Sequence, residues 1–151
     1  MDYRIITLTP ENFYKCENIG TMKRHADAAK KFYNDLVSGN RITYVYERDE
    51  EYLGEISLVF DMNDSDYTIK HKRIYISRLI VKPSERYKGI GKILLAYAIN
   101  RAKEMLYTEI SVGVDFDNYP AMKLYANTGF NQIIFIGEDE SGKYIKLLKH
   151  I

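Results

Sequence analysis

The sequence has 151 residues, a length typical of one globular domain. Its 22 Lys and Arg residues nearly balance its 21 Asp and Glu residues, giving a formal net charge of +1. Proteins that bind nucleic acid mainly through its phosphates usually carry a clear basic excess, so we expect no such partner. The single cysteine, Cys16, excludes an intrachain disulfide. No segment resembles a signal peptide or a membrane helix, and we therefore expect one cytoplasmic domain over residues 1–151 with no membrane partner.

The N-terminal half alternates strand-like and helix-like segments. Thr9 and Pro10 suit the start of a helix, and two β-branched and aromatic runs separated by a charged turn predict a hairpin. The predicted elements, in chain order, are a strand at 3–8, a helix from 9, a helix at 27–36, strands at 41–47 and 51–60, a polar loop at 61–72 and a strand at 73–82.

The C-terminal half starts with the clearest helix of the chain. Ile90, Leu94, Ala98 and Ala102 recur every four residues, which places them on one helical face. The predicted elements that follow are an alternating strand at 109–114, a short helix between Pro120 and Gly129, and a closing hairpin of strands on either side of 138–142. The order β, α, α, β, β, β, α, β, α, β, β indicates a mixed α/β (α+β) domain without internal repeats.

Residues 86–92, with the sequence RYKGIGK, combine two glycines with three basic side chains between a strand and a helix. A Walker loop would need Gly at position 86 and Ser or Thr at 93, where the chain has Arg86 and Ile93. A dinucleotide-binding fingerprint would need Gly or Ala at position 94, which is Leu94. Both of these phosphate-binding loops are therefore excluded.

The pattern that fits residues 86–92 is R-x-x-G-x-G leading into a helix. The first amides of a helix have no partner within it, and the helix N-terminus carries partial positive charge. Gly89 and Gly91 would let a pyrophosphate lie directly on those amides, with Arg86, Lys88 and Lys92 around it. Taken alone, the same residues also fit an ordinary turn into a helix.

A second motif makes the pattern specific. Residues 79–105 and 118–130, the latter reading NYPAMKLYANTGF, together resemble the GCN5-related N-acetyltransferase (GNAT) superfamily. The resemblance implies a single, mixed, mostly antiparallel sheet flanked by helices. It also implies that the strands at 73–82 and 108–114 splay apart to form a slot for coenzyme A.

The resemblance further implies the activity and its substrates. We expect an N-acetyltransferase that uses acetyl-CoA as co-substrate, needs no metal, and acetylates a primary amine of a small molecule or peptide by direct attack in a ternary complex. A homodimer is possible from family habit. Leu79–Val81 would bind the pantetheine arm as an added strand does, and the amide near Leu79 or Ile80 would face the acetyl oxygen. The expected coenzyme-binding residues are Leu79, Ile80, Val81, Arg86, Tyr87, Lys88, Gly89, Ile90, Gly91, Lys92 and Asn118.

The resemblance assigns Tyr125 the role of general acid that protonates the departing thiolate. Simple packing of its ring is the alternative for this residue. Asn118 either caps the helix that it precedes or binds the pantetheine arm.

The general base is left open by the sequence. An alkyl amine with a pKa of about 10.4 is almost fully protonated at pH 7, so a proton acceptor is needed. Tyr75 holds the position where some relatives place a glutamate on the strand. Glu55, Asp115 and Asp117 stay as candidates that would act through water.

Two further observations limit the interpretation. The loop at 61–72 has Asp61, Asn63 and Ser65 at alternate positions but lacks the glycine and glutamate of a calcium loop. Its Asp61, Asp64 and Asp66 either favour a cationic acceptor or are simply solvated. A sensor module that binds acyl-CoA without turnover is the alternative function.

Overall fold

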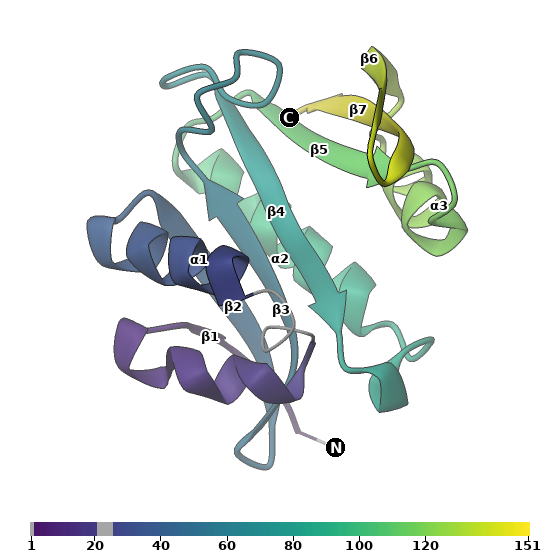
Figure 1. Ribbon diagram of the computed structural model, residues 1–151. Helices are drawn as coiled ribbons and strands as arrows, with labels where there is room; N and C mark the ends of the chain where they lie inside the picture. The colour runs from purple at the N-terminus through teal and green to yellow at the C-terminus, as the bar shows by residue number, and fades with distance from the viewer. Residues whose placement is uncertain (1, 21–25) are drawn as a thin grey trace. The chain divides into compact units, whose positions relative to one another are not determined.

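The structure is a computed structural model that describes residues 2–20 and 26–151 (Figure 1). Its elements follow the predicted order. They are β1 (Arg4–Thr7), the 3-10 helix η1 (Pro10–Asn18), α1 (Ala26–Ser38), β2 (Arg41–Arg48), β3 (Glu51–Val59), β4 (Arg73–Val81), the short 3-10 helix η3 (Pro83–Glu85), α2 (Ile90–Glu104), β5 (Glu109–Asp115), α3 (Tyr119–Asn127), β6 (Gln132–Asp139) and β7 (Gly142–His150).

The strands form one sheet of seven in the order β1-β2-β3-β4-β5-β7-β6. β1 pairs with β2, β5 with β7, and β7 with β6, all antiparallel, whereas β4 and β5 are parallel. This is the mixed sheet flanked by helices that the sequence predicts. The first helix differs from its prediction in type, because residues 10–18 form a 3-10 helix that begins at Pro10.

The chain divides into two compact units, each of which is described by itself. The first comprises Met1–Leu58 and Ser77–Ala98, and the second comprises Val59–Ile76 and Ile99–Ile151. β4 and α2 each contribute residues to both units. A single domain over residues 1–151 therefore stays a prediction.

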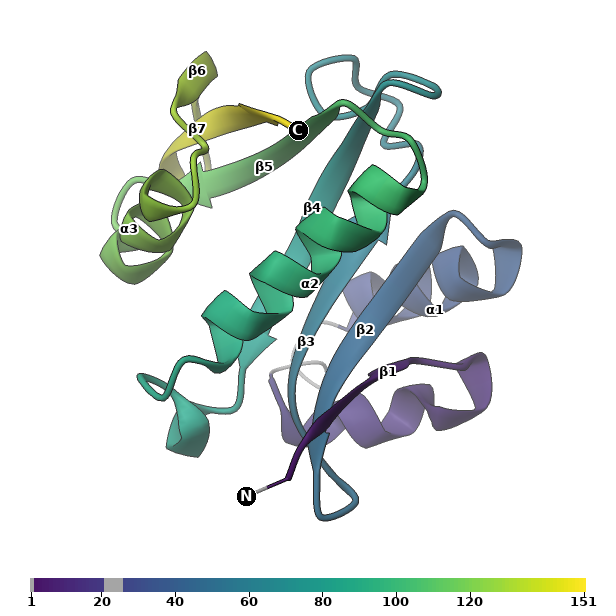
Figure 2. The ribbon, with the colours of Figure 1, turned by 180° about the vertical axis from the view of Figure 1, so that it is seen from behind.

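In the first unit, η1 and α1 cover one face of β2 and β3, and the N-terminal half of α2 covers the other (Figures 1 and 2). Gly54 of β3 lets α2 pack closely on the sheet. A Cβ at this position would lie 3.0 Å from the Ile90 side chain and 3.1 Å from the Leu94 side chain. Tyr97 of α2 meets Tyr44 of β2 edge to face, with 5.1 Å between ring centroids. The buried residues under η1 and α1 are Leu8, Cys16, Ile19, Val45 and Tyr52.

In the second unit, alternate residues of β5 and β7 form the core. Ile110, Val112 and Val114 of β5 are buried, as are Ile145 and Leu147 of β7. The intervening residues of both strands share the opposite face, since successive side chains of a strand point to opposite sides. That opposite face carries the pocket described below.

The regular geometry of β4 is interrupted at Arg78, whose φ is +58°. The register between β4 and β5 runs from Arg73↔Glu109 to Ile76↔Val112 and stops just before this residue. A non-glycine residue at positive φ inside a strand is strained backbone. The splayed strand pair expected from the resemblance stays a prediction.

Candidate functional site

The loop after β4 has the backbone of an anion-binding turn. Pro83 ends the strand, η3 follows, and the chain then turns through Tyr87 at φ +64° and Gly89 at φ +90° before α2 begins at Ile90. Left-handed residues next to a helix start turn successive amides toward one side, where they can bind an anion. A Cβ at position 89 would meet nothing within 4 Å, so the glycine is required by its φ and leaves the space above it open. Phosphate binding by residues 86–92 stays a prediction.

The basic side chains of this loop differ in their partners. Lys88 Nζ bonds to Glu85 at 3.1 Å, and Glu85 also bonds to Arg48. These two cations hold the pKa of the Glu85 carboxyl below its usual value. The Arg86 guanidinium donates to the carbonyl of Val81 at 3.0 Å. Arg86 thus ties the loop back to the strand, and the Lys88 charge is already partly compensated.

The expected pantetheine-binding segment, Leu79–Val81, lies at the end of β4. It follows the interruption at Arg78 and precedes Lys82, whose amide donates to the Leu53 carbonyl of β3. The two loop residues Gly91 and Lys92 lie in the first turn of α2. Residues 79–81 and 86–92 all belong to the first unit, whereas Asn118 and Tyr125 belong to the second.

Asn118 caps α3, which was one of the two roles left open for it. Its side-chain oxygen accepts a hydrogen bond from the Ala121 amide at 3.3 Å, and Pro120 occupies the first turn. The cap uses the carbonyl oxygen of the amide side chain. Contact of Asn118 with a pantetheine arm stays a prediction.

Tyr125 lies on α3 with 5% of its surface exposed. Its ring meets Phe130 edge to face at 5.4 Å between centroids. Burial, and to a smaller extent the nearby phenol of Tyr75, raises the pKa of Tyr125 above its ordinary value of 10.0. The hydroxyl therefore carries its proton at physiological pH, as a general acid must.

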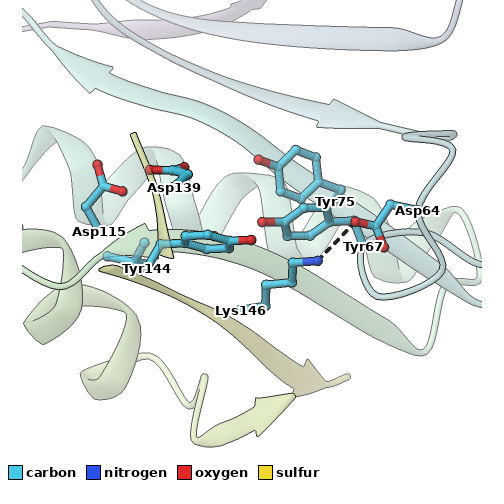
Figure 3. A pocket seen from close by; sticks show the side chains of 9 residues that line it. Asp64, Tyr67, Tyr75, Asp115, Asp139, Tyr144 and Lys146 are labelled. Atoms are coloured by element: carbon cyan, nitrogen blue, oxygen red, sulfur yellow. Dashed lines mark hydrogen bonds and ion pairs between the residues drawn. The ribbon is translucent and has the colours of Figure 1, made fainter. Parts of the chain in front are cut away.

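A pocket of about 360 Å³ lies in the second unit on the face of β5 and β7 opposite the core (Figure 3). Register explains how it is assembled, because β5 residue Gly113 faces Lys146 of β7, and Asp115 faces Tyr144. Tyr75 comes from β4 and Asp139 from the end of β6. Its lining residues are Asp64, Tyr67, Tyr75, Gly113, Val114, Asp115, Asp139, Tyr144 and Lys146.

The loop at 61–72 forms one wall of this pocket. The Ser111 hydroxyl of β5 donates to the Tyr67 carbonyl at 2.6 Å and fixes the loop on the sheet. The Tyr67 ring lies 4.4 Å from that of Tyr75, and its hydroxyl would be 2.5 Å from a Cβ at Gly113. Gly113 therefore provides the space that the Tyr67 side chain occupies.

Lys146 is held inside this wall by two carboxylates. Its ammonium lies 3.0 Å from Asp64 and 3.1 Å from Asp66, and 4.7 Å from the centroid of the Tyr67 ring. The two roles left open for these aspartates were attraction of a cationic acceptor and simple solvation, and in the structure both bind a lysine of the same chain. Asp61, the third, accepts a hydrogen bond from the amide of Asn63 at 2.8 Å.

Glu55 differs from the other candidate bases in being buried. It lies in the first unit with 3% of its surface exposed, and its Oε1 accepts from Arg78 Nε at 3.0 Å. Burial raises the pKa of Glu55, while the Arg78 guanidinium opposes that shift. Asp115 and Asp117 are exposed, and Asp115 lines the pocket.

Six lining residues were not identified as site residues from the sequence: Tyr67, Gly113, Val114, Asp139, Tyr144 and Lys146. The alternation of Tyr144 and Lys146 along a strand was visible in the sequence. What it could not supply was the register that sets these residues opposite Asp115 and Gly113.

Two absences concern the described residues alone. Between residues 2–20 and 26–151, the helices are all too short or too polar to cross a membrane. In the same part of the chain, no group of three or more His, Cys, Asp or Glu side chains is placed to hold a metal ion. The resemblance to the GNAT superfamily also implies that residues 21–36 shape the acceptor site, and residues 21–25 of this segment lie outside the described part of the chain.

Solved structures with the same fold include known acetyltransferases. The PaiA N-acetyltransferase of Thermoplasma acidophilum, in complex with coenzyme A, is 19% identical with a TM-score of 0.72, and the match covers 100% of both chains. The ribosomal-protein-S18-alanine N-acetyltransferase of Escherichia coli is 14% identical with a TM-score of 0.78, covering 99% of this chain and 94% of that one. At these identities the likeness shows the fold.

Sequence comparison extends the likeness. Human N-acetyltransferase 8 is 28% identical over 89 residues, which are 59% of this chain and 38% of the human protein, so the match spans well under half of that relative. The family model of the GNAT acetyltransferases matches residues 4–130, which include both motifs. Because this match spans most of the chain, the protein belongs to the GNAT family of acetyltransferases.

Proposed function

We propose that the protein transfers the acetyl group of acetyl-CoA to a primary amine of a small molecule or protein, by direct attack in a ternary complex. The observation that carries this proposal is the turn through Tyr87 and Gly89 at the start of α2. Such a turn at a helix N-terminus would present its amides to a pyrophosphate. Family membership supplies the reaction.

The residues of the first unit would bind the coenzyme. The amides of residues 87–92 hold the pyrophosphate, and Arg86, Lys88 and Lys92 add positive charge around it. The main chain of Leu79–Val81 pairs with the pantetheine arm, and an amide near Leu79 or Ile80 donates to the acetyl oxygen. Asn118 of the second unit caps α3 through its side-chain oxygen, and its side-chain nitrogen would donate to the pantetheine arm.

Tyr125 would protonate the sulfur of the departing coenzyme. Its raised pKa keeps the proton in place until the thiolate forms. A thiol has an ordinary pKa near 8.5, so the transfer is uphill in water. Burial raises the pKa of a thiol in the same direction as that of a phenol, so the transfer is less uphill than it would be if the phenol alone were buried.

The test is release of free thiol from acetyl-CoA in the presence of single amines. The set would hold alkyl monoamines, alkyl polyamines, amino acids, aminoglycosides, and peptides with a free N-terminus or lysine. Calorimetric binding of CoA would run beside it. Turnover with one class of amine supports the proposal and names the acceptor.

Two other outcomes would contradict it. Tight CoA binding without turnover on any amine favours the sensor function. The sensor function is also consistent with Tyr75, which stands where some relatives have a glutamate on the strand. Failure to bind CoA would remove the assigned role of residues 86–92.

The homodimer expected from the family stays part of the proposal. β6 ends the strand order, and its Ile133 and Ile136 side chains are exposed. Apolar side chains on an edge strand favour pairing with a second copy. Light scattering should give twice the chain mass, and Ile136→Lys should lower it. A monomer before substitution would contradict the dimer.

The cytoplasmic location also stays a prediction.

A further inference from the structure

The pocket of the second unit carries an excess of negative charge. Three of its lining residues are aspartates, and Asp66 joins Asp64 in binding Lys146 behind the wall. Four carboxylates and one ammonium group leave a formal charge of −3. Since Lys146 engages Asp64 and Asp66, the charges of Asp115 and Asp139 remain available to a ligand. The pocket therefore suits a cation.

The aromatic residues give the pocket a second property. The hydroxyl ends of Tyr67 and Tyr75 point toward the end where Asp115 and Asp139 lie, and the Tyr144 hydroxyl points back toward them (Figure 3). Tyrosine rings attract ammonium groups through their faces and pack against alkyl carbons. A wall of three tyrosines facing two carboxylates matches a ligand that alternates alkyl segments with ammonium groups.

The size of the pocket favours a slender ligand. Its volume of about 360 Å³ is at the lower end of the range for small-molecule sites. The Tyr67 side chain narrows it, because that ring is held at 4.4 Å from Tyr75 and against Gly113. An alkyl diamine of a few carbons is small enough for a space of this volume.

The chemistry of acetyl transfer adds a constraint. An amine must lose its proton before it attacks a thioester, whereas carboxylates beside that amine would stabilise its protonated form. Asp115 and Asp139 are therefore more useful for binding a second ammonium group that keeps its charge. Tyr75 lines the pocket, and its phenol also contributes to the raised pKa of Tyr125.

From these observations we propose that the acceptor is a linear alkyl polyamine, whose non-reacting ammonium group binds to Asp115 and Asp139 while its alkyl chain lies along Tyr67, Tyr75 and Tyr144. This inference rests on the proposed acetyltransferase function. In the reaction, the amine nitrogen bonds to the acetyl carbon as the thioester C–S bond breaks, and the departing thiolate takes the Tyr125 proton and leaves as the thiol. The proton lost by the amine passes to solvent, from which Tyr125 is protonated again, and the other ammonium group stays bound until the product departs.

The experiment compares 1,4-diaminobutane with n-butylamine, which has the same carbon chain and lacks the second charge. We expect kcat/KM for the diamine to be at least about tenfold higher, mainly through KM, and the preference to shrink as salt screens the exposed carboxylates. Asp115→Asn and Asp139→Asn should each raise the KM for the diamine by about fivefold. The KM for acetyl-CoA should stay unchanged.

The matched control is Glu140→Gln, which removes a neighbouring charge of the same hairpin turn that does not line the pocket. It should leave the diamine preference intact. Asparagine at position 139 can still accept the Ser141 amide bond of 2.8 Å, so the turn is preserved. Folding of each variant is checked by circular dichroism.

The outcomes separate this inference from the proposed function. Equal kcat/KM for the two amines, or a preference for aminoglycosides or lysine peptides, would overturn the polyamine acceptor while leaving the acetyltransferase standing. If no amine is acetylated, the proposed function fails. Calorimetry with 1,4-diaminobutane then tests the pocket directly. If the diamine does not bind, or binds equally well to the Asp115→Asn and Asp139→Asn variants, the inference is overturned as well.

Discussion

Tyr125 is the residue on which the proposed chemistry most depends. A motif could name it, but its chemical state follows from its surroundings. With 5% of its surface exposed and Tyr75 nearby, its phenol resists ionisation. The same burial that packs the ring against Phe130 thus keeps the hydroxyl protonated.

Tyr125→Phe removes the hydroxyl and keeps the ring. Loss of a general acid should lower kcat by about 10²-fold to 10⁴-fold, while calorimetric CoA affinity stays the same. Because the pKa of Tyr125 is raised, the wild-type enzyme should keep its acid form as pH rises to about 10. Unchanged turnover in the variant would leave Tyr125 with a packing role only.

Cys16 should be inert toward thiol reagents in the folded protein. Its side chain is fully buried, and burial, followed by the nearby Glu55 carboxylate, raises the pKa of the thiol. The thiolate is the reactive form, so reaction with a disulfide reagent should be at least about a hundredfold slower than in urea. Rapid labelling without denaturant would contradict the burial. Slow labelling also means that the thiol-release assay reports CoA alone.

At the scale of elements, the loop between β4 and α2 combines two left-handed residues with a helix start. Gly89 is needed at φ +90°, and Gly91 lies within α2. The sequence pattern indicated both glycines but not this difference. The first permits the turn, whereas the second leaves the helix start without a side chain.

Gly89→Ala should weaken CoA binding. An alanine at φ +90° costs about 1–2 kcal/mol of backbone strain, and the turn can relieve it only by moving the amides that face the phosphates. We expect Kd for CoA to rise by about tenfold in calorimetry.

Gly39→Ala is the matched control for this change. Gly39 also has a positive φ, +83°, and open space around its missing side chain, but it ends α1 rather than starting α2. Both variants should lose thermal stability to a similar degree, and only Gly89→Ala should lose CoA affinity. Equal affinity in the two variants would argue against phosphate binding by this loop.

At the scale of the whole molecule, the chain forms two compact units whose boundaries fall inside elements. The division crosses β4 between Ile76 and Ser77 and α2 between Ala98 and Ile99. Because a strand and a helix each run through both units, neither unit is a separate stretch of chain. We therefore expect the two to unfold together.

Leu58→Ala and Ile110→Ala test this expectation. Each removes a fully buried side chain, the first in one unit and the second in the other, and should cost about 2–5 kcal/mol. Far-ultraviolet and near-ultraviolet circular dichroism should report one coincident transition for each variant, moved to lower temperature. A variant that shifts only part of the transition would show two independently folding domains.

The order of elements was predictable from the sequence because each signal is local. Pro10, Pro83 and Pro120 lie at helix starts, and Gly129 follows the end of α3. The hairpin of β2 and β3 turns at Asp49 and Glu50, between two runs that are plainly strand-like. The family motifs at 79–105 and 118–130 were likewise visible, since their residues are close in the chain.

Only the tertiary structure decided how distant residues meet. The register of β5 and β7 sets Gly113 opposite Lys146 and Asp115 opposite Tyr144. Lys146 also binds Asp64 and Asp66, which lie about eighty positions away in the chain. A one-residue slip of β7 would turn Tyr144 and Lys146 to the other face of the sheet. Periodicity fixes which residues of a strand share a face, but register and long-range pairing arise from packing of the whole chain, and these produced the pocket.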